Sequence, residues 1–170
     1  TKKLVENEGR KAHFHQADLT DREQIRKSVE KCVEVYGRID ILVNNAGTIK
    51  RAPLLQYKDS DWKDVLDINL NAVYYMSHDV AKIMEKQGSG KIINVASMLS
   101  FQGGKFVPAY TASKHAVAGI TKSFANELAS KNIQVNAIAP GYVKTANTAP
   151  IRADEKRNKE ILDRIPANRW

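Results

Sequence analysis

Tyr110 and Lys114 are the two residues whose types and spacing most clearly suggest chemistry. They stand four positions apart in a predicted helix, so the phenol and the ammonium share one helical face. A phenol has a reference pKa of about 10 and is a poor base at neutral pH, but an adjacent positive charge lowers that pKa by favouring the phenolate. Such a pair can take a proton from an alcohol or give one to a carbonyl.

Two further polar residues could complete this unit. Ser97 follows a predicted strand and could hold the same substrate oxygen as negative charge develops on it, while Asn69, within a long predicted helix, could bind a water that links Lys114 to solvent. Taken singly, the four residues have ordinary structural explanations: a strand-end hydroxyl, a core-edge ring, a surface cation and a helix-internal amide. Their combination, at fixed positions relative to strands and helices, favours one acid/base unit.

The elements that must position these residues alternate between strands and helices. Thr20 and Glu23 form a capping box, apolar residues then recur at helical spacing, and Gly37 supplies a stop. Residues 39–43 are nearly all aliphatic, as in a strand that is covered on both faces. We predict strands at residues 12–15, 39–43, 91–96 and 133–139, and helices at residues 20–37, 60–87, 110–130 and 152–164.

This alternation predicts an α/β fold: a single domain with a Rossmann-like, doubly wound parallel sheet and helices on both faces. Ligands of such sheets bind beyond the carboxyl ends of the strands, so the residues to inspect are those immediately after Val43, Val95 and Ala139. The motif Asn44-Asn45-Ala46-Gly47 would let the backbone approach a flat ligand closely. It also suits a polar turn whose Asn side chains bond their own backbone, so the motif alone leaves both interpretations open.

Composition favours a soluble protein of a reducing compartment. The 170 residues contain no long apolar run and no secretory signal pattern, and the single cysteine, Cys32, allows neither a disulfide within the chain nor a cysteine-based metal cluster. The 27 basic and 19 acidic residues give a net charge of +8, but their scatter favours solvated surface over a nucleic-acid site. We expect a cytoplasmic protein without a metal site that binds neither membranes nor nucleic acid.

The residues singled out above resemble, in order and spacing, the short-chain dehydrogenase/reductase family over essentially the whole chain, and Pro140-Gly141 adds to the match. The resemblance implies an oxidoreductase that transfers a hydride to or from NAD, with NADP also open. It implies a catalytic tetrad of Asn69, Ser97, Tyr110 and Lys114. The implied cofactor contacts are Asp18 at the adenine ring, Leu19, Asn45, Ala46, Gly47, Tyr110, Lys114, Pro140, Gly141, Val143 and Thr145.

The sequence departs from the family pattern at its ends. The family's glycine-rich phosphate loop, the residue that selects NAD or NADP, and the closing strand do not occur in it. We therefore expect residues 1–170 to be an incomplete Rossmann-like catalytic domain. Residues 145–170, where the apolar pattern thins, are expected to form a mobile substrate lid.

Residues 91–104 and 136–170 resemble the family members that act on 2-dehydro-3-deoxy-D-gluconate. A small sugar-acid substrate is therefore implied, held at Ser97 and Tyr110. Its carboxylate needs a cation, for which Arg152 is the candidate, and Gln102 is the candidate partner for its hydroxyls. An exposed lid charge is the equal alternative for Arg152.

Other functions remain open on the sequence alone. Family members that act on gluconate or on 3-oxoacyl carrier protein would share every catalytic residue. A nucleotide-binding scaffold that lost catalysis is a further alternative, although it would not need Tyr110 and Lys114 in register. The helices at 60–87 and 110–130 resemble those that pair subunits in family tetramers, so we expect a homo-oligomer.

Overall fold

A three-stranded parallel sheet forms the centre of the protein in a computed structural model that describes residues 2–170. The strands are β1 (Ile41–Asn44), β2 (Gly90–Val95) and β3 (Ile133–Ile138), and they lie in the order β1-β2-β3. Ile41 is opposite Lys91, and Gly90 is opposite Ile133. Because parallel strands need long crossover connections, helical segments separate them in the chain, and all three carboxyl ends meet at one edge.

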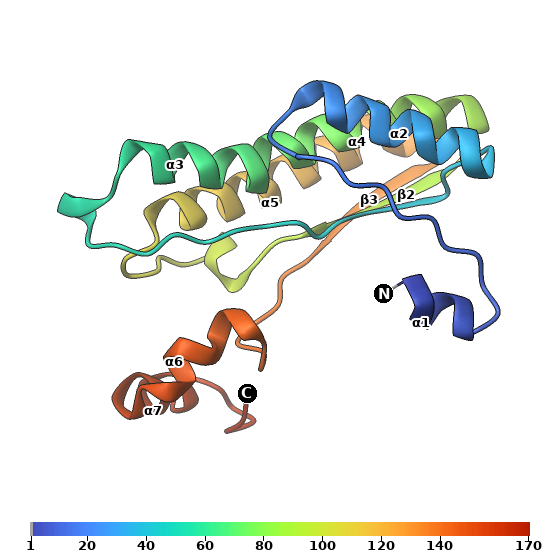
Figure 1. Ribbon diagram of the computed structural model, residues 1–170. Helices are drawn as coiled ribbons and strands as arrows, with labels where there is room; N and C mark the ends of the chain where they lie inside the picture. Colours follow the sequence, from blue (N-terminus) through green and yellow to red (C-terminus); the bar gives the residue numbers. More distant parts are fainter. Residues whose placement is uncertain (1) are drawn as a thin grey trace.

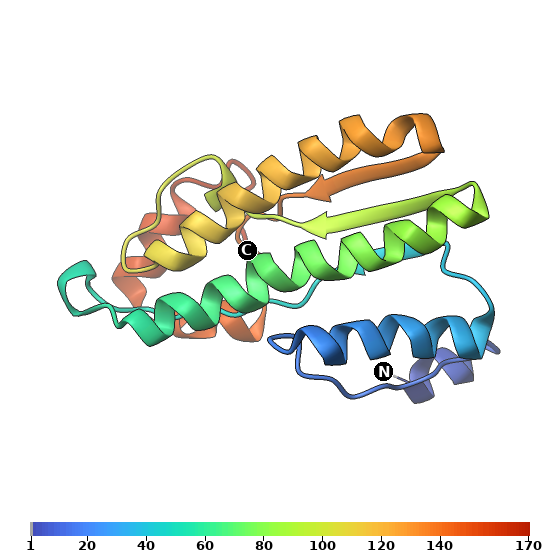
Figure 2. The same cartoon turned by 90° about the horizontal axis from the view of Figure 1, so that it is seen from above.

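Three long helices cover one face of this sheet, as Figures 1 and 2 show. They are α2 (Arg22–Tyr36), α4 (Ala72–Gln87) and α5 (Pro108–Leu128), with α4 between the other two. The short helices α1 (Lys2–Asn7), α6 (Ala149–Ala153) and α7 (Glu155–Leu162) lie on the opposite side. The remaining helical segments are η1 (Leu54–Gln56), α3 (Asp59–Leu66), η2 (Asp67–Asn71), η3 (Met98–Ser100), η4 (Ala129–Lys131) and η5 (Ala146–Thr148).

The core lies between the sheet and the three long helices. At its centre, Met84 of α4 is fully buried, and a Cβ added to Gly90 would come within 2.2 Å of the Met84 sulfur, so only glycine fits there. Burial of each aliphatic side chain contributes about 1.5–3 kcal/mol to folding. Cys32 is half-buried against this core, and burial raises the pKa of its thiol. The buried residues of this cluster are Val29, Ile39, Val80, Met84, Ile92, Ile133 and Val135, and Val73, Ala96 and Val117 form a second one.

Two expectations about the strands are wrong. Residues 12–15 form no strand, and Phe14 is exposed, because no strand among residues 2–170 pairs with this segment. Strand β1 is not covered on both faces either: Ile41 and Val43 are 61% and 53% exposed, since the long helices pack on the other face. The predicted parallel sheet itself is confirmed.

The start of α2 also differs from the prediction. Asp21 is the N-cap: its carboxylate accepts hydrogen bonds from the backbone N–H groups of Glu23 and Gln24. The predicted cap, Thr20, instead donates its hydroxyl to Asp18. A carboxylate at the N-cap also interacts favourably with the helix dipole. The predicted stop at Gly37 is confirmed, since its φ of 75° is the left-handed conformation of a helix C-cap.

The helix predicted at 60–87 is continuous but contains a π-helical turn, η2, between α3 and α4. The helix predicted at 152–164 is instead two short helices. Asp154, in extended conformation, ends α6, and its carboxylate accepts from the N–H of Arg157 to cap α7. An Asp that bonds the following backbone favours such a break.

Candidate active site

Lys114 is the buried cation of the site. It is 5% exposed, and its Nζ donates a hydrogen bond of 2.6 Å to the backbone carbonyl of Val95, the last residue of β2. Its Nζ also lies 5.5 Å from the centroid of the Tyr110 ring. Burial lowers the pKa of Lys114 to about 8. The structure therefore brings the phenol and the ammonium together, as the spacing predicts, because α5 begins at Pro108 and includes both residues.

Ser97 lies directly beyond β2 and caps the short helix η3. Its Oγ accepts from the N–H of Leu99 at 3.2 Å, and its own N–H donates to the hydroxyl of Ser100 at 3.2 Å. The Ser100 hydroxyl in turn donates to the backbone carbonyl of Lys114 at 2.7 Å. The turn that contains Ser97 is thus tied to the helix that contains Tyr110 and Lys114.

Asn69 is fully buried in the π-helical turn η2, where it joins the loop after β1 to α5. Its amide accepts from the N–H of Thr48 at 2.8 Å and donates to the Thr48 carbonyl at 2.9 Å. Its second N–H donates to Ser113 at 3.2 Å, and Ser113 donates to the carbonyl of Tyr110 at 2.8 Å. Both amide N–H groups are used, so a water bound by Asn69 would have to donate to an oxygen of this residue.

Gly47 lies against Asn69 and Lys114. A Cβ at this position would come within 3.3 Å of the Asn69 Oδ1 and 4.0 Å of the Lys114 Nζ, so the loop after β1 approaches the site as closely as a backbone can. Asn45, Ala46 and Gly47 are exposed there, at the carboxyl edge of the sheet. A flat ligand can therefore reach this loop beside Lys114.

Asn44, the first residue of the same motif, points into the protein instead. Its amide donates to Asn94 at 2.8 Å and to Ser77 at 2.9 Å, rather than to its own backbone. Asn94 donates onward to Thr121 at 2.9 Å. These buried bonds join β1, β2, α4 and α5 below the site, so Asn44 has a structural role that differs from that of its three neighbours.

The segment after β3 lies beside the Ser97 turn. The N–H of Met98 donates to the Pro140 carbonyl at 3.3 Å, and a Cβ on Gly141 would be 3.3 Å from the Met98 sulfur. Val143 is half-exposed and Thr145 caps η5. The structure thus brings Pro140 and Gly141 next to Ser97, on the sheet edge where ligands of parallel sheets bind.

Asp18 and Leu19 lie in the turn before α2. The Asp18 carboxylate accepts from the N–H and the hydroxyl of Thr20, at 2.8 Å in each case. Figure 2 shows the start of α2 on the side to which the strand arrows point. This places the turn toward the carboxyl edge of the sheet, where the implied cofactor contact requires it.

Gln102 and Arg152 are not held at the Tyr110 hydroxyl. Gln102 is exposed in the loop after η3. The Arg152 guanidinium donates to the Thr145 carbonyl at 3.0 Å and to the Thr148 hydroxyl at 3.4 Å, so it braces the segment between β3 and α6. Their predicted substrate contacts remain predictions.

Ser100 and Ser113 are the residues that sequence reasoning missed. Each stands three residues after a predicted site residue, Ser97 and Tyr110 respectively, and each bonds a backbone carbonyl of α5. A serine at this spacing is a common local hydrogen-bonding pattern, so the signal was present but weak. The chain segments that the two hydroxyls join could not be identified without the fold.

Comparison with known proteins identifies the family. Residues 1–156 match the family model described as short chain dehydrogenase. The chain belongs to this family, and the Rossmann-like parallel sheet is the family's fold.

Individual relatives show which members of the family this chain is similar to. The chain is 56% identical over all 170 residues to a 2-dehydro-3-deoxy-D-gluconate 5-dehydrogenase of Bacillus subtilis. Among solved structures, it resembles a protein of Beutenbergia cavernae assigned as an NAD(P)-dependent gluconate 5-dehydrogenase, with NADP bound at low occupancy (47% identity, TM-score 0.94, 99% of this chain and 68% of that one). It also resembles a protein of Agrobacterium tumefaciens assigned as a 2-deoxy-D-gluconate 3-dehydrogenase, with bound NADP (47% identity, TM-score 0.89, 99% of this chain and 67% of that one).

The chain spans 66% of the length of the Bacillus subtilis relative and 61% of those of Dickeya dadantii and Escherichia coli. No helix within residues 2–170 is both long and apolar enough to cross a membrane. Within the same residues, no three His, Cys, Asp or Glu side chains are grouped so that they could hold a metal ion.

Proposed function

We propose that the full-length protein is an NAD(P)-dependent oxidoreductase that interconverts a hydroxyl and a keto group on a sugar acid, specifically 2-dehydro-3-deoxy-D-gluconate. The observation that carries this proposal is the buried Lys114 ammonium, 5.5 Å from the Tyr110 ring, on a helix tied to the Ser97 turn. A buried lysine without a carboxylate partner costs free energy, and such groups concentrate at functional sites.

The residues divide the proton chemistry among them. In oxidation the Tyr110 phenolate takes the proton from the substrate alcohol, and in reduction the Tyr110 hydroxyl gives a proton to the carbonyl oxygen. The Lys114 ammonium stabilises the phenolate that forms. The Ser97 hydroxyl donates to the substrate oxygen as charge develops there. The nicotinamide ring supplies the hydride acceptor or donor when the dinucleotide is bound.

The residues beside Lys114 fit the nicotinamide half of such a dinucleotide. A Cβ at Gly47 would lie only 3.3 Å from the Asn69 Oδ1, and the exposed residues Asn45 and Ala46 lie in the same loop at the carboxyl edge of the sheet. We assign Asp18 and Leu19 to the adenine end, and Pro140, Gly141, Val143 and Thr145 to the nicotinamide end. Both NAD and NADP remain candidates; the similar structures with NADP in their descriptions favour NADP as the first to test.

A sugar acid is the substrate that the relatives favour, and the 56% identity to the Bacillus subtilis dehydrogenase is the supporting observation. In this proposal residues 145–170 close over the substrate, and Arg152, braced by Thr145, binds its carboxylate. Gln102, in the loop after η3, then forms hydrogen bonds with the hydroxyls of the substrate.

Substrate profiling tests the assignment. Purified full-length protein is assayed with each dinucleotide against 2-dehydro-3-deoxy-D-gluconate, gluconate and a 3-oxoacyl thioester. We expect the highest kcat/KM with the first. If the protein turns over only the thioester, it is an acyl reductase instead. If it turns over only gluconate, it is a gluconate dehydrogenase.

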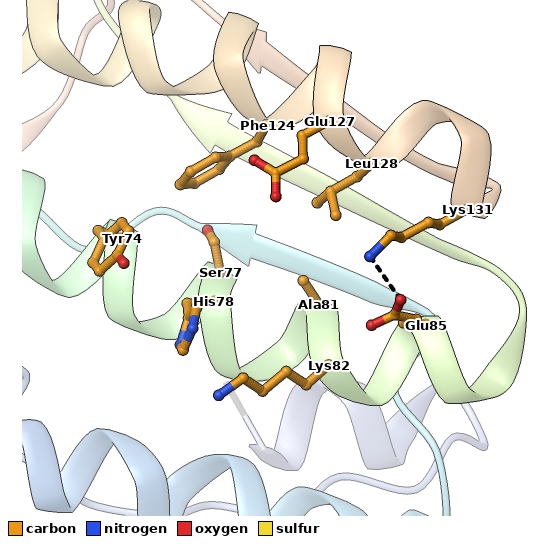
Figure 3. Close-up of a pocket in the computed structure, with 10 residues that line it drawn as sticks. All are labelled: Tyr74, Ser77, His78, Ala81, Lys82, Glu85, Phe124, Glu127, Leu128 and Lys131. Carbon is orange, nitrogen blue, oxygen red and sulfur yellow. Dashed lines mark ion pairs between the residues drawn. The ribbon is translucent and has the colours of Figure 1, made fainter.

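We also propose that α4 and α5 pair with the same helices of a second copy. A groove of about 240 Å³ separates these helices on the outer face. Figure 3 shows Tyr74 and Phe124 on its opposite walls and the ion pair of Lys131 with Glu85 across it, at 2.6 Å. Tyr74 is 43% exposed, a large ring area that a partner could cover.

We place this homo-oligomer in the cytoplasm, where the lone Cys32 thiol stays reduced.

A further inference from the structure

Ser100 joins two of the proposed catalytic residues through one oxygen atom. Its side chain is buried, and its hydroxyl accepts from the N–H of Ser97 at 3.2 Å while it donates to the carbonyl of Lys114 at 2.7 Å. Ser97 follows β2, whereas Lys114 lies on α5. One hydroxyl therefore connects the two elements at the site.

The contacts of the Ser97 hydroxyl leave its proton available for a hydrogen bond to substrate. Its Oγ accepts from Leu99, and among residues 2–170 no acceptor takes its proton. The loop that returns to α5 packs tightly on Leu99: a Cβ on Gly104 would come within 2.8 Å of the Leu99 Cδ1. The Ser97 turn is thus fixed from both sides, with one O–H left to donate.

We propose that Ser100 is a positioning residue of the reaction: its hydroxyl holds the Ser97 turn against the backbone of Lys114 and so sets the spacing between the Ser97 and Tyr110 hydroxyls. This inference rests on the proposed function of the site. Catalysis is sensitive to such spacing, since a displacement of about 1 Å can reduce the rate about 100-fold.

Thr121 offers a matched comparison. Like Ser100 it is buried, but it lies on α5, where its hydroxyl accepts from the Asn94 amide at 2.9 Å and donates to the Val117 carbonyl at 2.7 Å. Each hydroxyl therefore links α5 to β2 or to the turn that follows β2. The link at Thr121 lies two turns beyond Lys114 on α5. If the Ser100 hydroxyl had only a structural role, its removal should have the same effects as removal of the Thr121 hydroxyl.

The experiment compares Ser100→Ala, Ser100→Thr and Thr121→Ala in the full-length protein, with kcat expressed per dinucleotide-binding site. We expect Ser100→Ala to lower kcat at least 10-fold while the dinucleotide Kd changes less than twofold. Ser100→Thr, which keeps the hydroxyl, should recover most of kcat. Thr121→Ala should lower Tm but leave kcat within twofold. If Ser100→Ala fails to bind dinucleotide, Ser100→Cys replaces it, because a thiol fills similar space and hydrogen-bonds weakly.

Two results would overturn the inference alone: an active parent protein whose Ser100→Ala variant keeps kcat within twofold, or parallel losses of kcat and Tm in the Ser100 and Thr121 variants. A parent protein that binds dinucleotide but turns over no substrate contradicts the proposed function itself, and the role of Ser100 falls with it.

Discussion

Burial of the Lys114 ammonium costs free energy, and its neighbours in the site offset only part of that cost. Its ammonium has a carbonyl acceptor in Val95 and a nearby aromatic ring in Tyr110, but no carboxylate within residues 2–170 forms an ion pair with it. Burial without a counter-ion is the reason that its pKa falls to about 8. At neutral pH the site therefore holds a positive charge at a cost in stability, near the Tyr110 ring.

This cost predicts a pH-dependent stability. Because the folded-state pKa of about 8 lies below the unfolded value of 10.5, the unfolded chain binds more protons between these pH values. The lysine therefore destabilises the fold below pH 8, and the penalty is relieved as pH rises from 8 to 10.5. We expect the stability of the parent relative to Lys114→Met to rise across this window, by at most about 1.4 kcal/mol per pH unit.

Urea unfolding of both proteins at pH 7, 8, 9 and 10 measures this difference. Groups that titrate in both proteins cancel in the comparison. Parallel stability curves across the window would show that Lys114 is not buried as a charged group.

Spacing in the sequence predicts which residues can act together, but not how they are held. The separation of Tyr110 and Lys114 is local, so helical geometry alone places them together. The hydroxyl of Ser100 bonds a carbonyl fourteen residues away, and such a partner depends on how β2 packs against α5. Nothing local distinguishes this serine from an ordinary capping serine.

The π-helical turn η2 is the element that connects the loop after β1 to α5. Asn69 bonds the Thr48 backbone on one side and Ser113 on the other. The helix was predictable from its apolar period, whereas the turn within it was not, because it depends on an amide partner twenty-one residues away. Such turns are frequent at functional sites.

We expect Asn69→Ala to destabilise the protein by about 2–4 kcal/mol, since the Thr48 N–H and carbonyl lose their partners in a buried site. Asn71→Ala is the control: Asn71 lies on the same turn but is exposed, where it donates to Asp67. Its loss should cost less than about 0.5 kcal/mol. Urea denaturation measures both, and equal effects would contradict the role assigned to Asn69.

At the level of the entire protein, the alternating pattern predicts a parallel sheet, and the parallel pairing of β2 with both β1 and β3 confirms it. The predicted strand at residues 12–15 fails because a strand needs a neighbour that local sequence cannot supply. The exposed Ile41 and Val43 have the same origin: apolar pattern indicates which residues could be buried, not which face is covered. Long-range packing therefore accounts for most of the differences.

The proposed pairing through α4 and α5 is tested by filling the groove. Ala81 lines it, so Ala81→Arg should block close approach of a second copy and shift the protein to monomers. Asn126→Arg adds the same side chain to an exposed position of α5 that does not line the groove, and it should leave the assembly unchanged. Sedimentation velocity distinguishes these outcomes, and an unchanged assembly for Ala81→Arg would exclude this interface.

The Tyr110 hydroxyl is the atom on which the proposed reaction depends, and Tyr110→Phe removes only that atom. The decisive measurement is steady-state turnover of 2-dehydro-3-deoxy-D-gluconate by the full-length parent and variant, together with their dinucleotide Kd. We expect kcat to fall about 100- to 10,000-fold, with Kd within about twofold. Turnover that survives the substitution would remove Tyr110 from the proton transfer and contradict the mechanism.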